Sequence, residues 1–105
     1  MTDIKTLNDN FRKSFVGGTV LFTQGIKELP KPIIADILIK VQQFNDFNAN
    51  NDPYKERDMG KFVHEMVDVI WKIDYYDKNN MYHSPDPSNP EVTNRVLTIM
   101  RSDEY

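Results

Sequence analysis

The stretch from residue 60 to residue 76 constrains the fold most, because its apolar residues fit either a helix or a pair of strands. Toward its end, apolar and aromatic residues occupy every second position: Val69, Trp71, Ile73 and Tyr75. This period of two and the β-branched composition are typical of strands. We therefore predict that residues 60–67 pair antiparallel with the residues after a tight turn near Val67-Asp68. That turn lacks the Gly or Asn that two-residue turns favour.

A helix and a short strand are predicted before this hairpin. Apolar residues recur every three or four positions near the N-terminus: Ile4, Leu7, Phe11 and Phe15. The spacing predicts an amphipathic helix that ends at Gly17-Gly18, where glycine can adopt the left-handed cap conformation. Residues 19–23 are mostly β-branched or aromatic and precede Gly25, which predicts a strand.

Two further helices are predicted, one on each side of the hairpin. Pro30 and Pro32 suit a first helical turn, and an apolar stripe follows them: Ile34, Ile37, Leu38, Val41 and Phe44. Residues 45–53 are rich in Asn and Asp, which predicts an exposed loop. Ser88 and Glu91 have capping-box spacing. A second stripe then predicts a C-terminal helix: Val92, Val96, Ile99 and Met100.

These elements predict a single α+β domain over residues 1–105, in the order α-β-α-β-β-α. A chain of 105 residues has room for one core. We expect about three strands in a small antiparallel sheet, with three helices packed on one face.

Composition excludes several classes of function. The formal net charge is −3 and the basic residues are scattered, whereas nucleic-acid binders gather basic residues on one face. We therefore expect no direct nucleic-acid binding. No apolar run approaches the roughly 20 residues that cross a bilayer, so we expect a cytoplasmic protein without a membrane partner. The absence of cysteine excludes thiolate zinc sites and cysteine nucleophiles.

Two local patterns approach metal sites, and each breaks at a required position. His64-Glu65-Met66-Val67-Asp68 has Asp where a zinc-protease helix needs its second His. The stretch from Asp46 to Arg57 follows a calcium-loop pattern but has Asn at its sixth position and Arg at its twelfth. No phosphate-binding or dinucleotide motif is present. We predict no metal site and no cofactor.

Longer motifs resemble an uncharacterised bacterial family, domain of unknown function 3768. The resemblance rests on Leu7-Asn8-Asp9-x-Phe11-Arg12, Gly17-Gly18, Asn51-Asp52-Pro53-Tyr54-x-Glu56-x-Asp58-x-Gly60, Trp71-Lys72-Ile73-Asp74-Tyr75-Tyr76-Asp77, Ser84-Pro85-Asp86-Pro87 and Thr93-x-Arg95-Val96-Leu97-Thr98-Ile99-Met100. It implies an accessory protein of bacteria, often carried by plasmids or other mobile elements. It implies no activity and no catalytic residue.

Two polar groups of residues within these motifs are the candidate binding site. The first group is Asp52, Tyr54, Glu56 and Asp58, and the second is Asp74, Tyr76, Asp77, His83 and Asp86. If the two loops meet, they form one acidic and aromatic face, although Asp also makes turns. Tyr is favoured at protein interfaces.

We expect a non-enzymatic protein-interaction module, such as a mobile-element or phage accessory or anti-defence factor that binds a host protein. A homodimer is the other partnership that the aromatic content suits. The alternative from another class is a small-molecule or metal-dependent binder or hydrolase. It would use Asp74, Asp77, His83 and Asp86, because neighbouring carboxylates and imidazoles can serve as acid and base.

Overall fold

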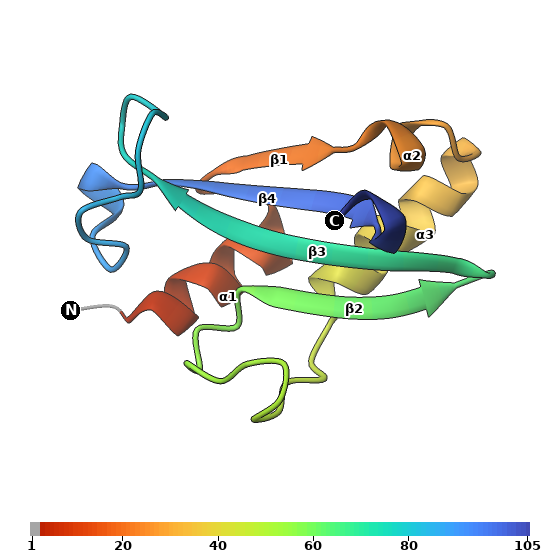
Figure 1. Cartoon of the computed structure of the whole chain (residues 1–105), viewed down its shortest axis with the longest axis horizontal. Coiled ribbons are helices and arrows are strands. Elements are labelled where there is room, and N and C mark those ends of the chain that lie inside the picture. The colour runs from red at the N-terminus through yellow and green to blue at the C-terminus, as the bar shows by residue number, and fades with distance from the viewer. Residues whose placement is uncertain (1–2) are drawn as a thin grey trace.

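The computed structural model describes residues 3–105 as a four-stranded sheet with helices on one face (Figure 1). The strands are β1 (Thr19–Phe22), β2 (Met59–His64), β3 (Val67–Tyr76) and β4 (Asn94–Arg101). They lie side by side in the order β1-β4-β3-β2. β4 pairs parallel with β1 and antiparallel with β3, which pairs antiparallel with β2. The α+β class is confirmed, but the sheet is mixed and has one strand more than predicted.

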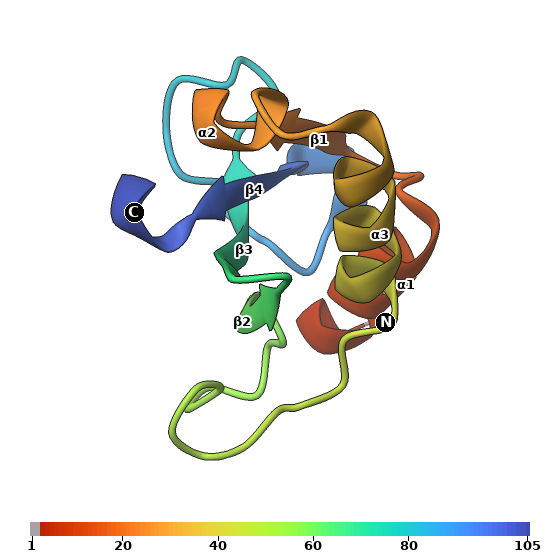
Figure 2. The same ribbon diagram turned by 90° about the vertical axis from the view of Figure 1, so that its right-hand side faces the viewer.

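The two longer helices are α1 (Ile4–Ser14) and α3 (Lys31–Gln42), and Figure 2 shows both on the same side of the strands. A single helical turn, α2 (Gln24–Lys27), joins β1 to α3. Two short 3-10 turns flank β4: η1 (Pro90–Val92) and η2 (Ser102–Glu104). No helix within residues 3–105 is long and apolar enough to cross a membrane.

α1 ends earlier than its glycine pair suggested. Its last residue is Ser14, and the left-handed cap conformation belongs to Phe15, with φ of 58°. The Phe15 amide donates a hydrogen bond to the carbonyl of Phe11, which closes the last turn. Gly17 has a φ of 107°, so the glycine shapes the connection to β1 rather than the end of the helix.

Trp71 occupies the centre of the core and is fully buried. Its neighbours across the sheet are Gly60 and Ile99. The rings of Phe44 and Phe47 meet it edge-on at centroid distances of 5.5 and 6.1 Å. The loop of residues 45–53 is therefore not wholly exposed as predicted, because Phe47 packs against the core.

Residues 94–101 form a central strand, so the predicted C-terminal helix is wrong. Arg95, Leu97 and Ile99 occupy every second position, so their side chains share the face toward the helices, and all three are buried. On the opposite face Met100 is also buried and Val96 is half-buried. Because apolar residues lie on both faces of this strand, some of them fall by chance at the spacing of a helix, and this spacing gave the wrong prediction.

The predicted hairpin within residues 60–76 is confirmed, but its turn lies two residues earlier than expected. Val67 and Asp68 already pair with His64 and Val63. The turn residues are Glu65 and Met66, whose φ angles are 46° and 68°. Two consecutive positive φ values match the tight turn that follows the twist of a hairpin.

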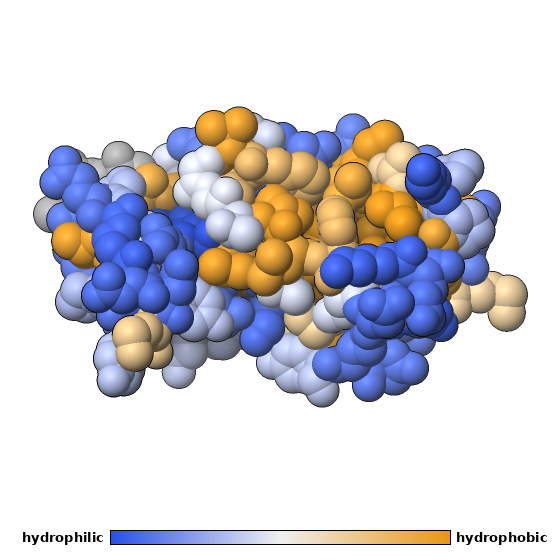
Figure 3. All heavy atoms as spheres, turned by 90° about the horizontal axis from the view of Figure 1, so that it is seen from above, coloured by the Kyte–Doolittle hydropathy of each residue, from blue (hydrophilic) through white to orange (hydrophobic). Residues whose placement is uncertain are grey.

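Figure 3 shows the molecule from above, relative to Figure 1. The most apolar surface in this view is the β1 edge of the sheet. Leu21 of β1 is 49% exposed, and Val20 and Phe22 are half-buried. The left end of the molecule in this view is mostly polar, whereas the right end is mixed.

Candidate functional site

Most of the residues predicted as a site lie on two loops that approach each other, whereas Asp74 and Tyr76 lie at the end of β3. Residues 52–58 precede β2, and residues 77–89 follow β3. Tyr54 and Glu56 line the same hollow as Ser88, together with the first residues of α1. We call the surface of residues 52–58 and 74–86 the acidic loop face.

Tyr75 joins the two loops from beneath. Its hydroxyl donates a 2.8 Å hydrogen bond to the Glu56 carboxylate. Its ring meets the ring of His83 edge-on at 6.2 Å. Burial raises the pKa of Tyr75, so the hydroxyl keeps its proton and remains a donor to Glu56.

Carboxylates from the loop of residues 52–58 and from β3 influence Asp58. Burial is the main cause that raises the pKa of Asp58, and the negative charges of Glu56, Asp52 and Asp74 raise it further. These four predicted residues therefore lie close enough to interact electrostatically. Their negative charges therefore act on one another in this part of the molecule.

Three of the predicted carboxylates also hold the loops in shape. Asp52 accepts a hydrogen bond from the amide of Arg57. Asp77 accepts one from the amide of Met81, and Asp86 accepts from the amide and hydroxyl of Ser88. Such contacts are typical of turns built by Asp side chains.

The remaining predicted residues differ in how they meet solvent. Tyr54 is 83% exposed, and His83 is exposed beside Tyr76, with which it forms an isolated bridge. Asp74 pairs with Lys72 at 3.3 Å. Within residues 3–105, no group of three or more His, Asp or Glu side chains is arranged to hold a metal ion.

A buried polar network beneath the acidic loop face was not predicted. Asn8 of α1 is fully buried and donates to the Tyr75 hydroxyl at 2.7 Å and to the Glu56 carbonyl at 3.0 Å. Its carbonyl oxygen accepts a 2.8 Å hydrogen bond from Nε of Arg95. The network thus links a loop carboxylate to an arginine in the central strand.

Arg12, one turn along α1, anchors a second set of contacts. Its guanidinium donates to the carbonyls of Val41 and Gln42 at the end of α3 and forms a 3.1 Å ion pair with Asp9. Asp9 also pairs with Arg57 at 3.0 Å. Cations suit the C-terminal end of a helix, where carbonyls lack partners, so Arg12 fixes α1 against α3.

A family model described as a protein of unknown function (DUF3768) matches residues 22–104. The chain belongs to this family. Curated proteins and solved structures gave no match to the chain.

The DUF3768 match covers both acidic loops and Arg95 but begins after α1. Asn8 and Arg12, which complete the buried network, therefore lie before the matched residues. The two N-terminal motifs of the resemblance, residues 7–12 and Gly17-Gly18, also precede it. Residues outside the match thus position residues inside it.

The sequence contains one signal for this network. Asn8 and Arg12 are four positions apart beside the apolar stripe of α1, so they share a flank of the helix that reaches the core. Their partners are at least 29 residues away in the chain, apart from Asp9. Sequence spacing alone carries no information about such distant contacts.

Proposed function

We propose that the chain is a non-enzymatic interaction module that binds a basic surface of a protein partner through its acidic loop face. One observation carries the proposal. Three large side chains of these loops extend into solvent beside the carboxylates: Tyr54 (83% exposed), Tyr82 (70%) and Met81 (69%).

Aromatic residues and Met are enriched at protein interfaces, because they offer a large contact area. Tyr54 and Tyr82 come from different loops, so together they span the face. The tyrosine hydroxyls add hydrogen-bonding groups at its rim.

The buried network supports this function because it holds the loops before any partner binds. Glu56 is fixed through its side chain by Tyr75 and through its carbonyl by Asn8. A loop that is already ordered loses less conformational entropy on binding. The network therefore favours a preformed binding face.

Charge specifies the kind of partner. The acidic loop face contains six acidic and three basic residues. Complementary potentials accelerate association and select partners, so a partner surface rich in Lys and Arg fits best. The resemblance implies an accessory protein of bacteria that is often carried by mobile elements. A role as a mobile-element or phage accessory or anti-defence factor that binds a host protein stays a prediction.

Affinity purification with paired variants tests the proposal. The double variant Tyr54→Ala/Tyr82→Ala removes the aromatic contacts from exposed positions, so the fold should remain intact. Tyr105→Ala is the matched control, because Tyr105 is 72% exposed but lies beyond β4. A partner retained by the control and lost by the double variant supports the proposal. Equal recovery by both variants would contradict it.

The alternative, a small-molecule or metal-dependent binder or hydrolase at Asp74, Asp77, His83 and Asp86, also stays a prediction. Asp77 and Asp86 already accept backbone hydrogen bonds, which favours the interaction function over chemistry at these groups. A thermal-shift screen with divalent metals and nucleotides distinguishes the two. Only the alternative predicts a rise in melting temperature that Asp77→Asn abolishes.

A further inference from the structure

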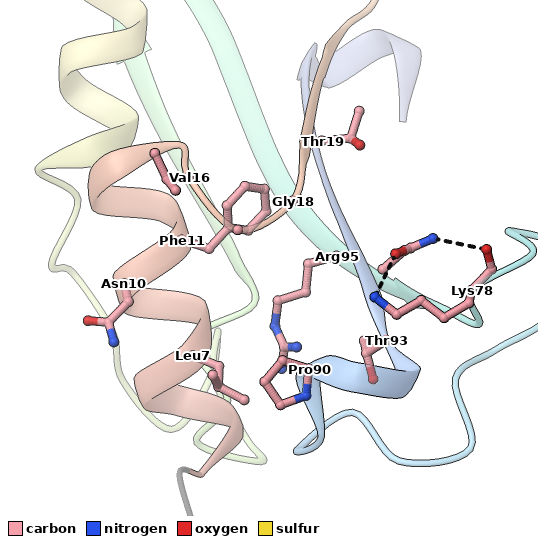
Figure 4. A pocket seen from close by; sticks show the side chains of 12 residues that line it. Leu7, Asn10, Phe11, Val16, Gly18, Thr19, Lys78, Pro90, Thr93 and Arg95 are labelled. Carbon is pink, nitrogen blue, oxygen red and sulfur yellow. Dashed lines mark hydrogen bonds between the residues drawn. The ribbon is translucent and has the colours of Figure 1, made fainter.

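A hollow of about 470 Å³ lies between α1, the Gly17-Gly18 connection and the start of β4 (Figure 4). Leu7 and Phe11 form its apolar wall on α1. Lys78 and Arg95 provide its positive charge, and none of the described residues that line it is acidic. Of these lining residues only Lys78 belongs to the acidic loop face, and the function proposed above does not use the hollow.

Within the part of the chain that the structure describes, Arg95 is a buried cation without a carboxylate counter-ion. The side chain is 4% exposed and extends between Leu7 of α1 and Pro90 of η1. Its Nε donates to Asn8 and its Nη2 to the carbonyl of Pro87, both neutral groups. No carboxylate in residues 3–105 lies within 4.0 Å of its nitrogens.

Burial lowers the pKa of Arg95, which reflects the cost of removing its charge from water. Buried charges in proteins are normally paired, because an isolated one is strongly unfavourable. Among residues 3–105, the Tyr75 ring, whose centroid lies 5.2 Å from Cζ of Arg95, and the more distant Glu56 carboxylate partly compensate this charge. A bound anion would supply the missing charge directly.

One nitrogen of Arg95 is available to such an anion. Nη1 has no hydrogen-bond partner among residues 3–105. The fully buried side-chain nitrogens without a partner in these residues are Arg12 Nε, His64 Nε2 and Trp71 Nε1, and Nη1 of Arg95 is not among them. Nη1 therefore touches solvent. Arg95 lines the hollow, and Figure 4 shows its guanidinium end between Leu7 and Pro90, two other lining residues.

Lys78 gives a second positive group. Its Nζ lies 3.3 Å from the side-chain oxygen of Asn94 and makes no ion pair with a described carboxylate. Figure 4 shows this contact, and the Asn94 amide in turn donates to the carbonyl of Lys78. The contacts hold the ammonium group near the hollow and leave its other protons available.

Gly18 allows the hollow to have this shape. A Cβ atom at Gly18 would lie 2.5 Å from the Arg95 carbonyl and 2.7 Å from the Phe11 ring. Only glycine therefore lets the connection pass this close to both β4 and α1.

We propose that the hollow binds a small organic anion, with its phosphate or carboxylate on Arg95 and Lys78 and its apolar part against Leu7 and Phe11. A guanidinium group and an ammonium group recognise both kinds of anion. The apolar wall adds affinity for a ligand that also carries a hydrocarbon or aromatic group.

NMR titration of the full chain tests this site, with inorganic phosphate, phenyl phosphate and benzoate as probes at constant ionic strength. We expect saturable shifts of the Arg95 Nε–H signal and of the Gly17 and Gly18 amides, with dissociation constants in the millimolar range or tighter. Phenyl phosphate should bind more tightly than inorganic phosphate because of the apolar wall. Comparison with benzoate distinguishes a phosphate site from a carboxylate site.

Lys78→Ala should weaken binding of the better probe about tenfold, as expected for one charged hydrogen bond. Lys13→Ala is the matched control, because Lys13 is an exposed residue of α1 that does not line the hollow, and it should leave the affinity unchanged. Lys78 is exposed, so its variant should fold even where an Arg95 variant does not. Absence of saturable shifts for all three probes, or equal affinities for both lysine variants, would overturn the proposal.

Discussion

The side-chain amide of Asn8 donates a 2.7 Å hydrogen bond to the hydroxyl of Tyr75, although 67 residues separate them in the chain. This contact joins α1 to the end of β3 in the interior. It also connects the buried side of the acidic loop face to Arg95, because Asn8 accepts from that arginine. One neutral side chain thus forms hydrogen bonds with two ionisable residues.

Replacing Asn8 with leucine should destabilise the protein strongly. The change keeps similar volume but leaves Tyr75 without its donor and Nε of Arg95 without its acceptor, each buried. Unsatisfied buried groups of this kind cost about 2–4 kcal/mol together. Urea denaturation measures the loss of unfolding free energy. Asn10→Leu, at an exposed position of the same helix, should change it by less than about 0.5 kcal/mol. Equal effects of the two variants would contradict a special role for Asn8.

Tyr75→Phe should cost about 1–2 kcal/mol, because the ring stays in place while the bonds to Asn8 and Glu56 are lost. The destabilisations caused by Tyr75→Phe and by Asn8→Ala should not be additive, since each change removes the Asn8–Tyr75 hydrogen bond. A double-mutant cycle with Asn8→Ala should give a coupling energy of at least about 0.5 kcal/mol. Strict additivity would show that the two side chains act independently.

Asp58→Asn should alter how stability depends on pH. The pKa of Asp58 is raised above its ordinary 3.8, first by burial, so the folded state holds this proton more tightly than the unfolded state. The free energy of unfolding therefore falls as pH rises from 3.8 through the raised pKa. Asparagine has no such titration, so the variant should gain stability relative to the parent over this interval. Urea midpoints from about pH 4 to about pH 7 measure this difference. A difference that stays constant across that range would argue against the raised pKa.

The turn of the β2–β3 hairpin can be improved. Glu65 and Met66 both adopt positive φ, which disfavours residues with a Cβ. The double change Glu65→Asn/Met66→Gly supplies the preferred pair for such a turn and should stabilise the fold by about 1–2 kcal/mol. Thermal denaturation checks the gain. The control Glu65→Ala/Met66→Ala keeps both Cβ atoms and should give no comparable rise in melting temperature. An equal rise would mean that losing the Glu65 and Met66 side chains, rather than relieving the backbone, stabilises the protein.

Gly60→Ala should be destabilising although the change is small. A Cβ at this position would lie 2.5 Å from Nε1 of Trp71 and 2.7 Å from the Phe44 ring. Overpacking of a core typically costs about 1–3 kcal/mol. Denaturation followed by Trp71 fluorescence reports both the loss and the disturbed packing. Lys61→Ala, at an exposed position of the same strand, is the control. Unchanged stability and fluorescence would mean that the core can relax around the extra methyl group.

The sequence predicts best those elements that bury one face. In α1 and α3 the apolar stripe is one-sided, and in β3 the residues Val69, Trp71, Ile73 and Tyr75 mark the buried side. β4 has buried apolar residues on both faces, Leu97 and Ile99 on one and Met100 on the other, so no clean alternation remains in its sequence. A strand with apolar residues on both faces is therefore hard to distinguish from a helix in one sequence.

The site shows the same limit in another form. Tyr54, Glu56 and Asp58 were recognisable because polar and aromatic residues concentrate in a short motif. The approach of Glu56 to Tyr75 depends on how β3 lies against the preceding loop. The burial of Arg95 depends on β4 being a strand, which spacing did not reveal. The correct placement of one strand therefore decides whether the network can be predicted.

The position of β4 between β1 and β3 also sets an order for folding in the cell. β1 and the β2–β3 hairpin leave the ribosome first, but nothing joins them until residues 94–101 emerge between them. Thr19 must then meet Val96 across most of the chain, a contact of high sequence separation that slows folding. Until residues 94–101 have left the ribosome, the edges of β1 and β3 that pair with β4 stay exposed in the nascent chain, which makes this interval the one in which chaperones would matter most.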